Sequence, residues 1–129
     1  ARGLKLLAEA GLIELDKSAE LPSDTDVTSN PKNLKFTTVD GAQVYKSMPD
    51  AEAAVINGNY AIDAGLNPKN DSLVLEKGGK GSEYPNQLVV RKDDKDNEHL
   101  KKLAKLLNDE KLREYITTTW PDGAVVPAF

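Results

Sequence analysis

The sequence predicts an α/β fold, and two observations carry that prediction. Apolar residues recur with helical spacing near both ends of the chain, and several short apolar runs typical of β-strands lie between those ends. An alternation of helices with short buried strands is the pattern of the α/β class. The chain has 129 residues, of which 39% are hydrophobic and 29% charged. That composition indicates one globular domain and argues against a disordered or fibrous chain.

The first element is a short amphipathic helix, predicted within residues 1–15. Leu4 and Leu7 share one stripe of that helix, and Gly11 is typical of a residue that ends one. Residues 18–33 contain few large apolar side chains and many Ser, Asp, Thr and Pro residues. This composition predicts a loop with one helical turn.

Short apolar runs predict strands at residues 34–39, 53–56, 73–75 and 88–90. The first run alternates apolar and polar residues, as a half-buried strand does, whereas the second is continuously apolar, as in a strand covered on both faces. A brief helix is expected between them, over residues 42–48. The second run ends at a polar, Gly-containing loop over residues 57–59, and α/β proteins bind ligands where a strand ends in such a loop.

Two further helices are predicted towards the end of the chain. From Asn97 onwards, apolar residues return with helical spacing. Residues 108–110 then offer a new N-terminal cap for a helix that carries Leu112 and Ile116. The tail, residues 123–129, is apolar, and we expect it to pack back on the body of the protein.

Charge and composition exclude several classes of protein. The formal net charge is −4 and the pI about 5.0, and the lysines are evenly spread, so the basic stripe of a nucleic-acid-binding protein is missing. The sequence contains no cysteine, which excludes a disulfide framework and a cysteine-based zinc site. No window approaches the ~18 consecutive apolar residues of a membrane-spanning helix.

Catalytic motifs are also missing, and we expect no enzyme, no metal site and no cofactor. The single histidine, His99, falls at a charged helix start and is expected to be an exposed helical residue. None of the serines sits in a nucleophile-elbow pattern. The glycine-rich run at residues 78–82 lacks the spacing of a phosphate-binding loop, and the acidic cluster at residues 93–96 lacks that of a calcium loop.

Polar groups at the ends of apolar runs are the remaining candidates for function. They are Arg2, Asn57 and Asn86. A guanidinium pairs bidentately with a carboxylate, and an Asn amide offers both a carbonyl oxygen and an NH2 group, so the three together suit a zwitterionic amino acid. An alternative interpretation is that the asparagines form turns and that Arg2 is a frayed terminal residue.

Six blocks of sequence, in order along the whole chain, closely resemble the NlpA/MetQ lipoprotein family. They are residues 1–15, NPKNLKF at 30–36, AAVINGNYA at 53–61, AGLNPK at 64–69, SEYPN at 82–86 and GAVVPAF at 123–129. The resemblance implies the substrate-binding component of a methionine ABC importer, with two α/β lobes closing on methionine (L or D), a related amino acid or a short peptide. It further implies a periplasmic-binding-protein-like (type II) lobe, with a mixed sheet flanked by helices.

The likeness covers only the later portion of the family. Residues 1–72 correspond mostly to the second lobe and residues 73–129 to crossover strands and C-terminal helices, while the first lobe is largely absent. The chain starts without Met and without a leader, so we expect a fragment. The resemblance implies an extracytoplasmic protein that works with a membrane permease. It is tethered only through an N-terminal lipid anchor, which lies outside this chain.

The resemblance also implies roles for the three polar residues. Arg2 matches the family arginine that pairs with the ligand carboxylate, and Asn57 and Asn86 match the two asparagines that hold the amino acid head group. The chain departs from the family at Glu83 and Pro85, where the usual order is Ser-Pro-Tyr-x-Asn. Residues 18–26 lack the common Asp-Gly-x-Gly turn.

A second hypothesis is an isolated structural or interaction domain that binds no small molecule, because a lone lobe offers half a cleft. Such a lobe exposes surface that its partner lobe covers, and a homodimer of the fragment is compatible with that surface.

Overall fold

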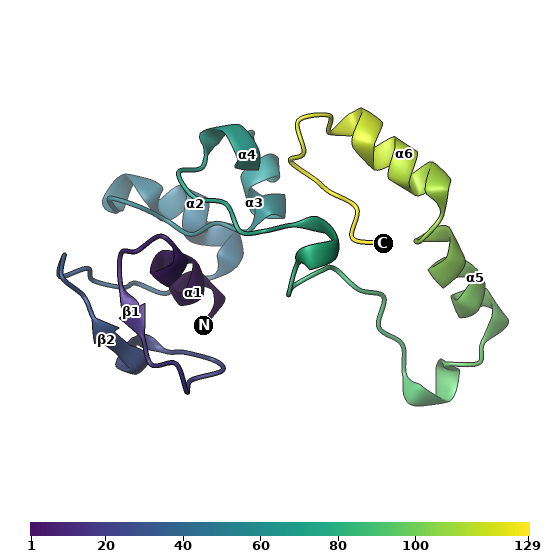
Figure 1. Ribbon diagram of the computed structural model, residues 1–129. Helices are drawn as coiled ribbons and strands as arrows, with labels where there is room; N and C mark the ends of the chain where they lie inside the picture. Colours follow the sequence, from purple (N-terminus) through teal and green to yellow (C-terminus); the bar gives the residue numbers. More distant parts are fainter. The chain divides into compact units, whose positions relative to one another are not determined.

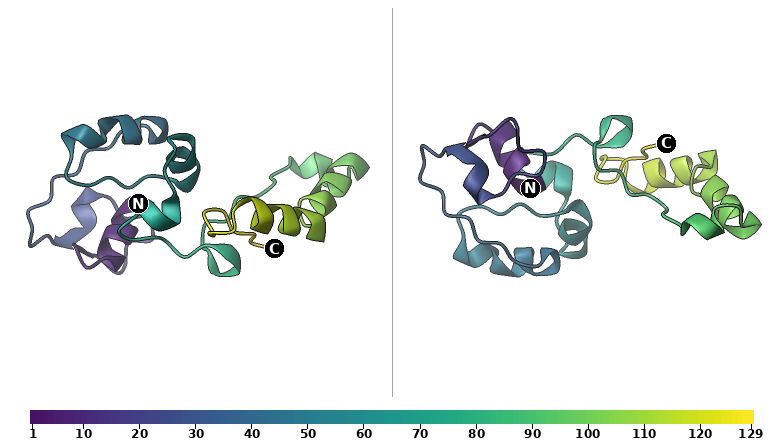
Figure 2. Two further views of the ribbon diagram at one scale, coloured as in Figure 1. Left: turned by 90° about the horizontal axis from the view of Figure 1, so that it is seen from above. Right: turned by 90° about the horizontal axis from the view of Figure 1, so that it is seen from below.

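The computed structural model describes residues 1–129, apart from the side chain of Lys80. The chain forms two compact units, residues 1–76 and residues 77–129. Figure 1 labels the helices and strands of both units, and Figure 2 shows them from two further directions.

The first unit begins with helix α1 (Arg2–Glu9), which confirms the predicted amphipathic helix. Gly11 ends it as expected, with a φ of 70°. The N–H groups of Gly11 and Leu12 donate to the carbonyl oxygens of Ala8 and Leu7, at 2.9 and 3.0 Å. This is the Schellman pattern, in which a residue in the left-handed region satisfies the last carbonyl groups of a helix.

A two-stranded antiparallel sheet follows α1, formed by β1 (Glu14–Leu15) and β2 (Val27–Ser29). Glu14 lies opposite Ser29 and Leu15 opposite Val27, with an irregularity in register between the two pairs. The sequence did not predict these strands. The helical turn predicted between residues 18 and 33 is confirmed at η1 (Asp24–Asp26), where Ser23 and Asp26 form a capping box.

The rest of the first unit is helical and irregular. A 3-10 turn, η2 (Gly41–Gln43), leads into α2 (Val44–Ser47) and then η3 (Met48–Asp50), which confirms the brief helix expected over residues 42–48. Helices α3 (Gly58–Asp63) and α4 (Pro68–Asp71) follow (Figure 1). Asn67 caps α4 by accepting from the N–H groups of Lys69 and Asn70, at 3.0 and 3.1 Å.

The second unit contains 3-10 turns η4 (Gly79–Gly81) and η5 (Lys92–Asp94) and helices α5 (Glu98–Leu106) and α6 (Glu110–Thr119). Both helices begin where the sequence predicts, because Asn97 and Asp109 accept backbone N–H bonds as N-terminal caps. The tail folds back from α6 (Figures 1 and 2). There Arg113 donates to the carbonyl oxygen of Phe129 and lies 4.8 Å from the centre of its ring.

The prediction of four strands was wrong. The runs concerned, residues 34–39, 53–56, 73–75 and 88–90, are all irregular in the structure. A strand requires a neighbour that accepts and donates its backbone hydrogen bonds. Within the described part of the chain, the only paired strands are β1 and β2. Ala53, Ala54 and Val55 are exposed, so the second run is not covered on both faces as predicted.

The hydrophobic core of the described residues is small. Ile13, which leads into β1, and Ala61, on α3, are the buried hydrophobic residues. Pro22, in a loop, and Pro68, at the start of α4, are also buried. Leu73 and Val89, in two of the irregular runs, are 99% and 83% exposed. These two side chains therefore face solvent instead of a core.

Candidate functional site

Arg2 holds a carboxylate in this structure. It is the first residue of α1, and its Nε donates to Oε1 and Oε2 of Glu76 at 2.9 and 3.1 Å, while one terminal guanidinium nitrogen donates to Oε2. This is a bidentate, charge-assisted pair. The hydrogen bonds from Arg2 lower the pKa of the Glu76 carboxyl below its ordinary value, against the opposing effect of partial burial.

The position of Arg2 makes it an anion-binding group. The N-terminus of a helix carries partial positive charge from unpaired N–H groups, and α1 has no side-chain cap. The guanidinium adds a full positive charge at the same end. The backbone of Gly3, the next residue, lies against Val55: a Cβ atom added at Gly3 would lie 3.6 Å from Cβ of Val55. The start of α1 therefore lies beside the segment that leads to Asn57.

Asn57 is the N-terminal cap residue of α3, and its side chain makes no capping hydrogen bond. Its backbone carbonyl accepts from Ala61 N–H at 3.0 Å. The main chain of Asn57 therefore makes a hydrogen bond of the first helical turn, whereas its exposed side-chain amide makes no capping bond. Asn67 and Asn97 occupy the same position in α4 and α5 and do cap with their side chains. The amide of Asn57 is thus not used to form the turn.

Asn86 belongs to the second unit, whereas Arg2 and Asn57 both belong to the first. It is exposed in the irregular segment that precedes the run at residues 88–90. In the turn before it, the hydroxyl oxygen of Ser82 accepts from Tyr84 N–H at 3.1 Å.

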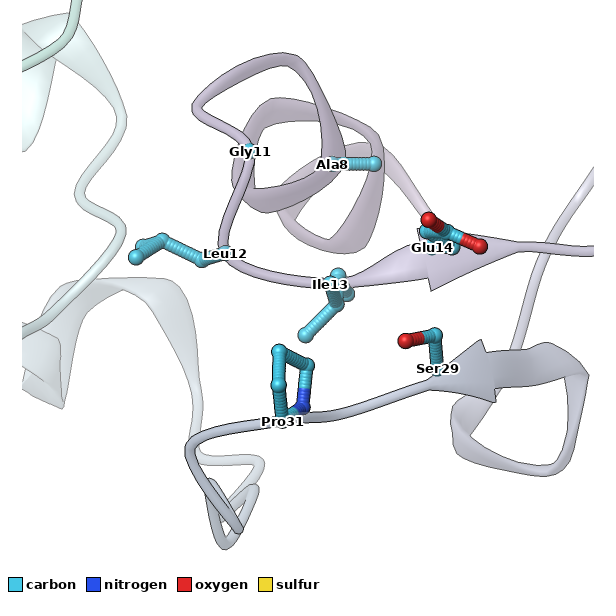
Figure 3. Close-up of a pocket in the computed structure, with 7 residues that line it drawn as sticks. All are labelled: Ala8, Gly11, Leu12, Ile13, Glu14, Ser29 and Pro31. Atoms are coloured by element: carbon cyan, nitrogen blue, oxygen red, sulfur yellow. The ribbon is translucent and has the colours of Figure 1, made fainter.

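Two hollows in the first unit are lined by other residues. One of about 280 Å³ lies between the end of α1 and the small sheet. Figure 3 shows Ile13 and Pro31 lining it, with the carboxylate of Glu14 and the hydroxyl of Ser29 nearby. The other, of about 440 Å³, is lined by Tyr45, Lys46, Met48 and Pro49. Neither is lined by Arg2, Asn57 or Asn86.

His99 is exposed on α5, as the sequence predicts. Among the described residues, no group of three or more His, Cys, Asp or Glu side chains gathers as metal ligands do. No helix in the described part of the chain has the length and hydropathy needed to cross a bilayer.

Sequence reasoning missed Glu76. It lies 74 positions from Arg2, and no local pattern links the two residues. The one available signal was its position, a lone carboxylate directly after the apolar run at residues 73–75.

Residues 1–129 match the protein family described as NlpA lipoprotein. The chain belongs to the NlpA lipoprotein family. One curated relative is the D-methionine-binding lipoprotein MetQ of Salmonella typhi, which is 39% identical over 127 residues. The match covers 96% of this NlpA-family chain and 46% of that relative. The chain thus spans less than half the length of that curated relative.

Solved structures of the family have the same fold. A nutrient binding protein from Burkholderia cenocepacia bound to methionine is 37% identical with a TM-score of 0.90, and the match covers 99% of this chain and 54% of that one. An ABC transporter, periplasmic substrate-binding protein from Coxiella burnetii is 39% identical with a TM-score of 0.84, with coverage of 98% and 52%. The predicted α/β fold class is confirmed by these similarities.

Proposed function

We propose that this NlpA-family chain is part of the substrate-binding component of an ABC importer. The complete protein binds methionine (L or D), a related amino acid or a short peptide between two lobes. Residues 1–72 belong mostly to the second lobe, and residues 73–129 supply the crossover back towards the first lobe and the C-terminal helices. The names of the relatives, a D-methionine-binding lipoprotein and a periplasmic substrate-binding protein, support this role.

The protein works by binding and closure, without covalent chemistry. Closure of two lobes on a ligand is a common hinge motion, and the closed form is the one that docks on the membrane permease. The complete protein is extracytoplasmic and tethered to the membrane as a lipoprotein, as the names of the relatives suggest.

Arg2 binds the carboxylate of the ligand, and Asn57 and Asn86 hold its amino acid head group. The observation that carries this proposal is the bidentate grip of Arg2 on a carboxylate, that of Glu76. The unused amide of Asn57 supports it, because an Asn amide can accept from an ammonium group and donate to a carboxylate.

Calorimetric titration of the complete protein with methionine tests the proposal. We expect Arg2→Ala to weaken binding by about 2–5 kcal/mol, because closure of the two lobes on the ligand desolvates the pair of Arg2 with the ligand carboxylate, and truncating one partner of such a pair has this cost. Arg91→Ala is the matched control, since Arg91 also donates from Nε to a carboxylate, that of Asp94 at 2.9 Å. Equal affinity of the Arg2 and Arg91 variants rules out the role of Arg2.

The alternative function is a structural or interaction domain that binds no ligand. The exposed apolar runs around Leu73 and Val89 favour it, because such surface is typical of an interface. A thermal melt separates the two functions. A ligand that binds only the native state raises the melting temperature, so an unchanged melting temperature at saturating methionine supports the alternative.

A further inference from the structure

We propose that Glu76 occupies, on Arg2, the position that the carboxylate of the ligand takes, so that Glu76 and the ligand compete for one guanidinium. This inference rests on the proposed function of Arg2. It makes Glu76 a residue that determines which ligands bind, because only a ligand with its own carboxylate replaces it.

The geometry of the pair supports competition. Both Glu76 oxygens accept from Nε of Arg2, at 2.9 and 3.1 Å, and Oε2 also accepts from a terminal nitrogen. An α-carboxylate has the same two oxygens and the same charge, and it makes the same fork with a guanidinium. A second carboxylate beside Glu76 brings two like charges together, which disfavours the ionised form of both. Replacement avoids that cost.

Exposure of the pair allows the exchange. The side chains of Arg2 and Glu76 are 47% and 28% exposed. An ion pair that reaches solvent contributes little free energy, so a dissolved carboxylate displaces Glu76 at small cost.

The backbone segment that carries Glu76 can move the Glu76 side chain away from Arg2. Leu73, Val74 and Leu75 precede Glu76, lie outside any helix or strand and are exposed. Within the described residues, no backbone ladder anchors this segment. Movement of Glu76 away from Arg2 therefore breaks no regular hydrogen bonds.

Charge explains why a carboxylate lies at this position. The guanidinium and the N-terminus of α1 are both positive, and an anion beside them is stabilising. Glu76 supplies that anion within the chain. The hydrogen bonds from Arg2 keep it ionised, which is consistent with the lowered pKa of its carboxyl.

The first experiment is calorimetric titration of the complete protein with methionine. We expect Glu76→Gln to bind methionine about two- to fivefold more tightly, the loss of a competing surface ion pair. Asp94→Asn, which breaks the comparable pair with Arg91, is expected to leave the affinity unchanged. In an Arg2→Ala background, Glu76→Gln should have no effect. In the protein that retains Arg2, weaker or equal binding of methionine by Glu76→Gln overturns the inference, since removing a residue that only positions Arg2 would weaken binding.

The second experiment needs no methionine binding. Acetate is titrated into the complete protein at constant ionic strength, and NMR follows the Arg2 Nε–H resonance and the Glu76 carboxyl carbon. We expect acetate to move both resonances in parallel as it displaces Glu76, while the same concentration of chloride does not. If acetate displaces Glu76 but methionine does not bind, the proposed function fails and the competition stands. If methionine binds and neither experiment detects displacement, the competition fails and the proposed function stands.

Discussion

Glu76 titrates below its ordinary range because Arg2 donates hydrogen bonds to both of its oxygens. A carboxyl group whose pKa is lower in the folded state than in the unfolded state stabilises the fold above its unfolded pKa. That stabilisation disappears as the pH falls through the lowered folded value. The parent protein is therefore expected to be more stable than Glu76→Gln at pH 7, by less than about 1 kcal/mol because the pair reaches solvent. The difference should vanish in acid.

Urea denaturation of both proteins at neutral pH and at successively lower pH measures this difference. Asp16 and Asp26 also have lowered pKa values, from hydrogen bonds donated by Ser18 and Ser23. Their contributions occur in both proteins and cancel in the comparison. A stability difference that stays constant at every pH contradicts the assigned role of the ion pair.

Single residues were predictable from sequence only where their partners are local. Asn97 and Asp109 precede helices and cap them as predicted, because the N–H groups they accept lie two or three residues away. Arg2 was a candidate because of its chemistry and the family resemblance. Its partner Glu76 could not be found, since only the tertiary fold brings residues 2 and 76 together.

The two glycines at the ends of helix α3 differ in the backbone conformation that they adopt. Gly65, just after the helix, has a φ of 79°, and its N–H and that of Leu66 donate to Ile62 and Ala61. Gly58, the first residue of the helix, has ordinary φ, and a Cβ there meets only Pro68 Cγ at 4.0 Å. We expect Gly65→Ala to destabilise the protein by about 1–2 kcal/mol and Gly58→Ala to stabilise it by up to about 1 kcal/mol.

Thermal melts of the two variants beside the parent measure these effects. A Cβ at Gly65 meets nothing within 4 Å, so a loss of stability there comes from backbone strain and not from a clash. Melting temperatures that shift in the same direction for both variants contradict this account of the helix.

The same contrast explains which elements were predictable. A helix forms its hydrogen bonds within its own segment, and the helices predicted at the start of the chain, at residues 42–48 and after Asn97 all form. A strand needs a second segment, and the apolar runs at 34–39 and 88–90 find none among the described residues. The amino acids of these runs are typical of strands, but a run by itself does not determine whether a second segment pairs with it.

At the scale of the molecule, the chain has the fold of its solved NlpA-family relatives but covers only about half the length of each. Its TM-score of 0.90 to the Burkholderia protein is reached over 54% of that chain. The irregular apolar runs therefore follow a path that a longer protein also takes. In the 129-residue chain, irregular segments with exposed apolar side chains leave backbone groups outside any sheet, as the unpaired edge of a sheet does.

We therefore expect the 129-residue chain to self-associate through these runs. Replacing Leu73 and Val89 together by lysine should reduce association in sedimentation velocity and lower the binding of a hydrophobic dye, because charges on an exposed edge oppose pairing. Both side chains are largely exposed, so the stability of the monomer should change by no more than about 0.5 kcal/mol. Leu21→Lys is the control, because Leu21 is 80% exposed outside any of the predicted strands. If Leu21→Lys disperses the protein as well as the double variant does, association depends on net charge and not on the irregular apolar runs.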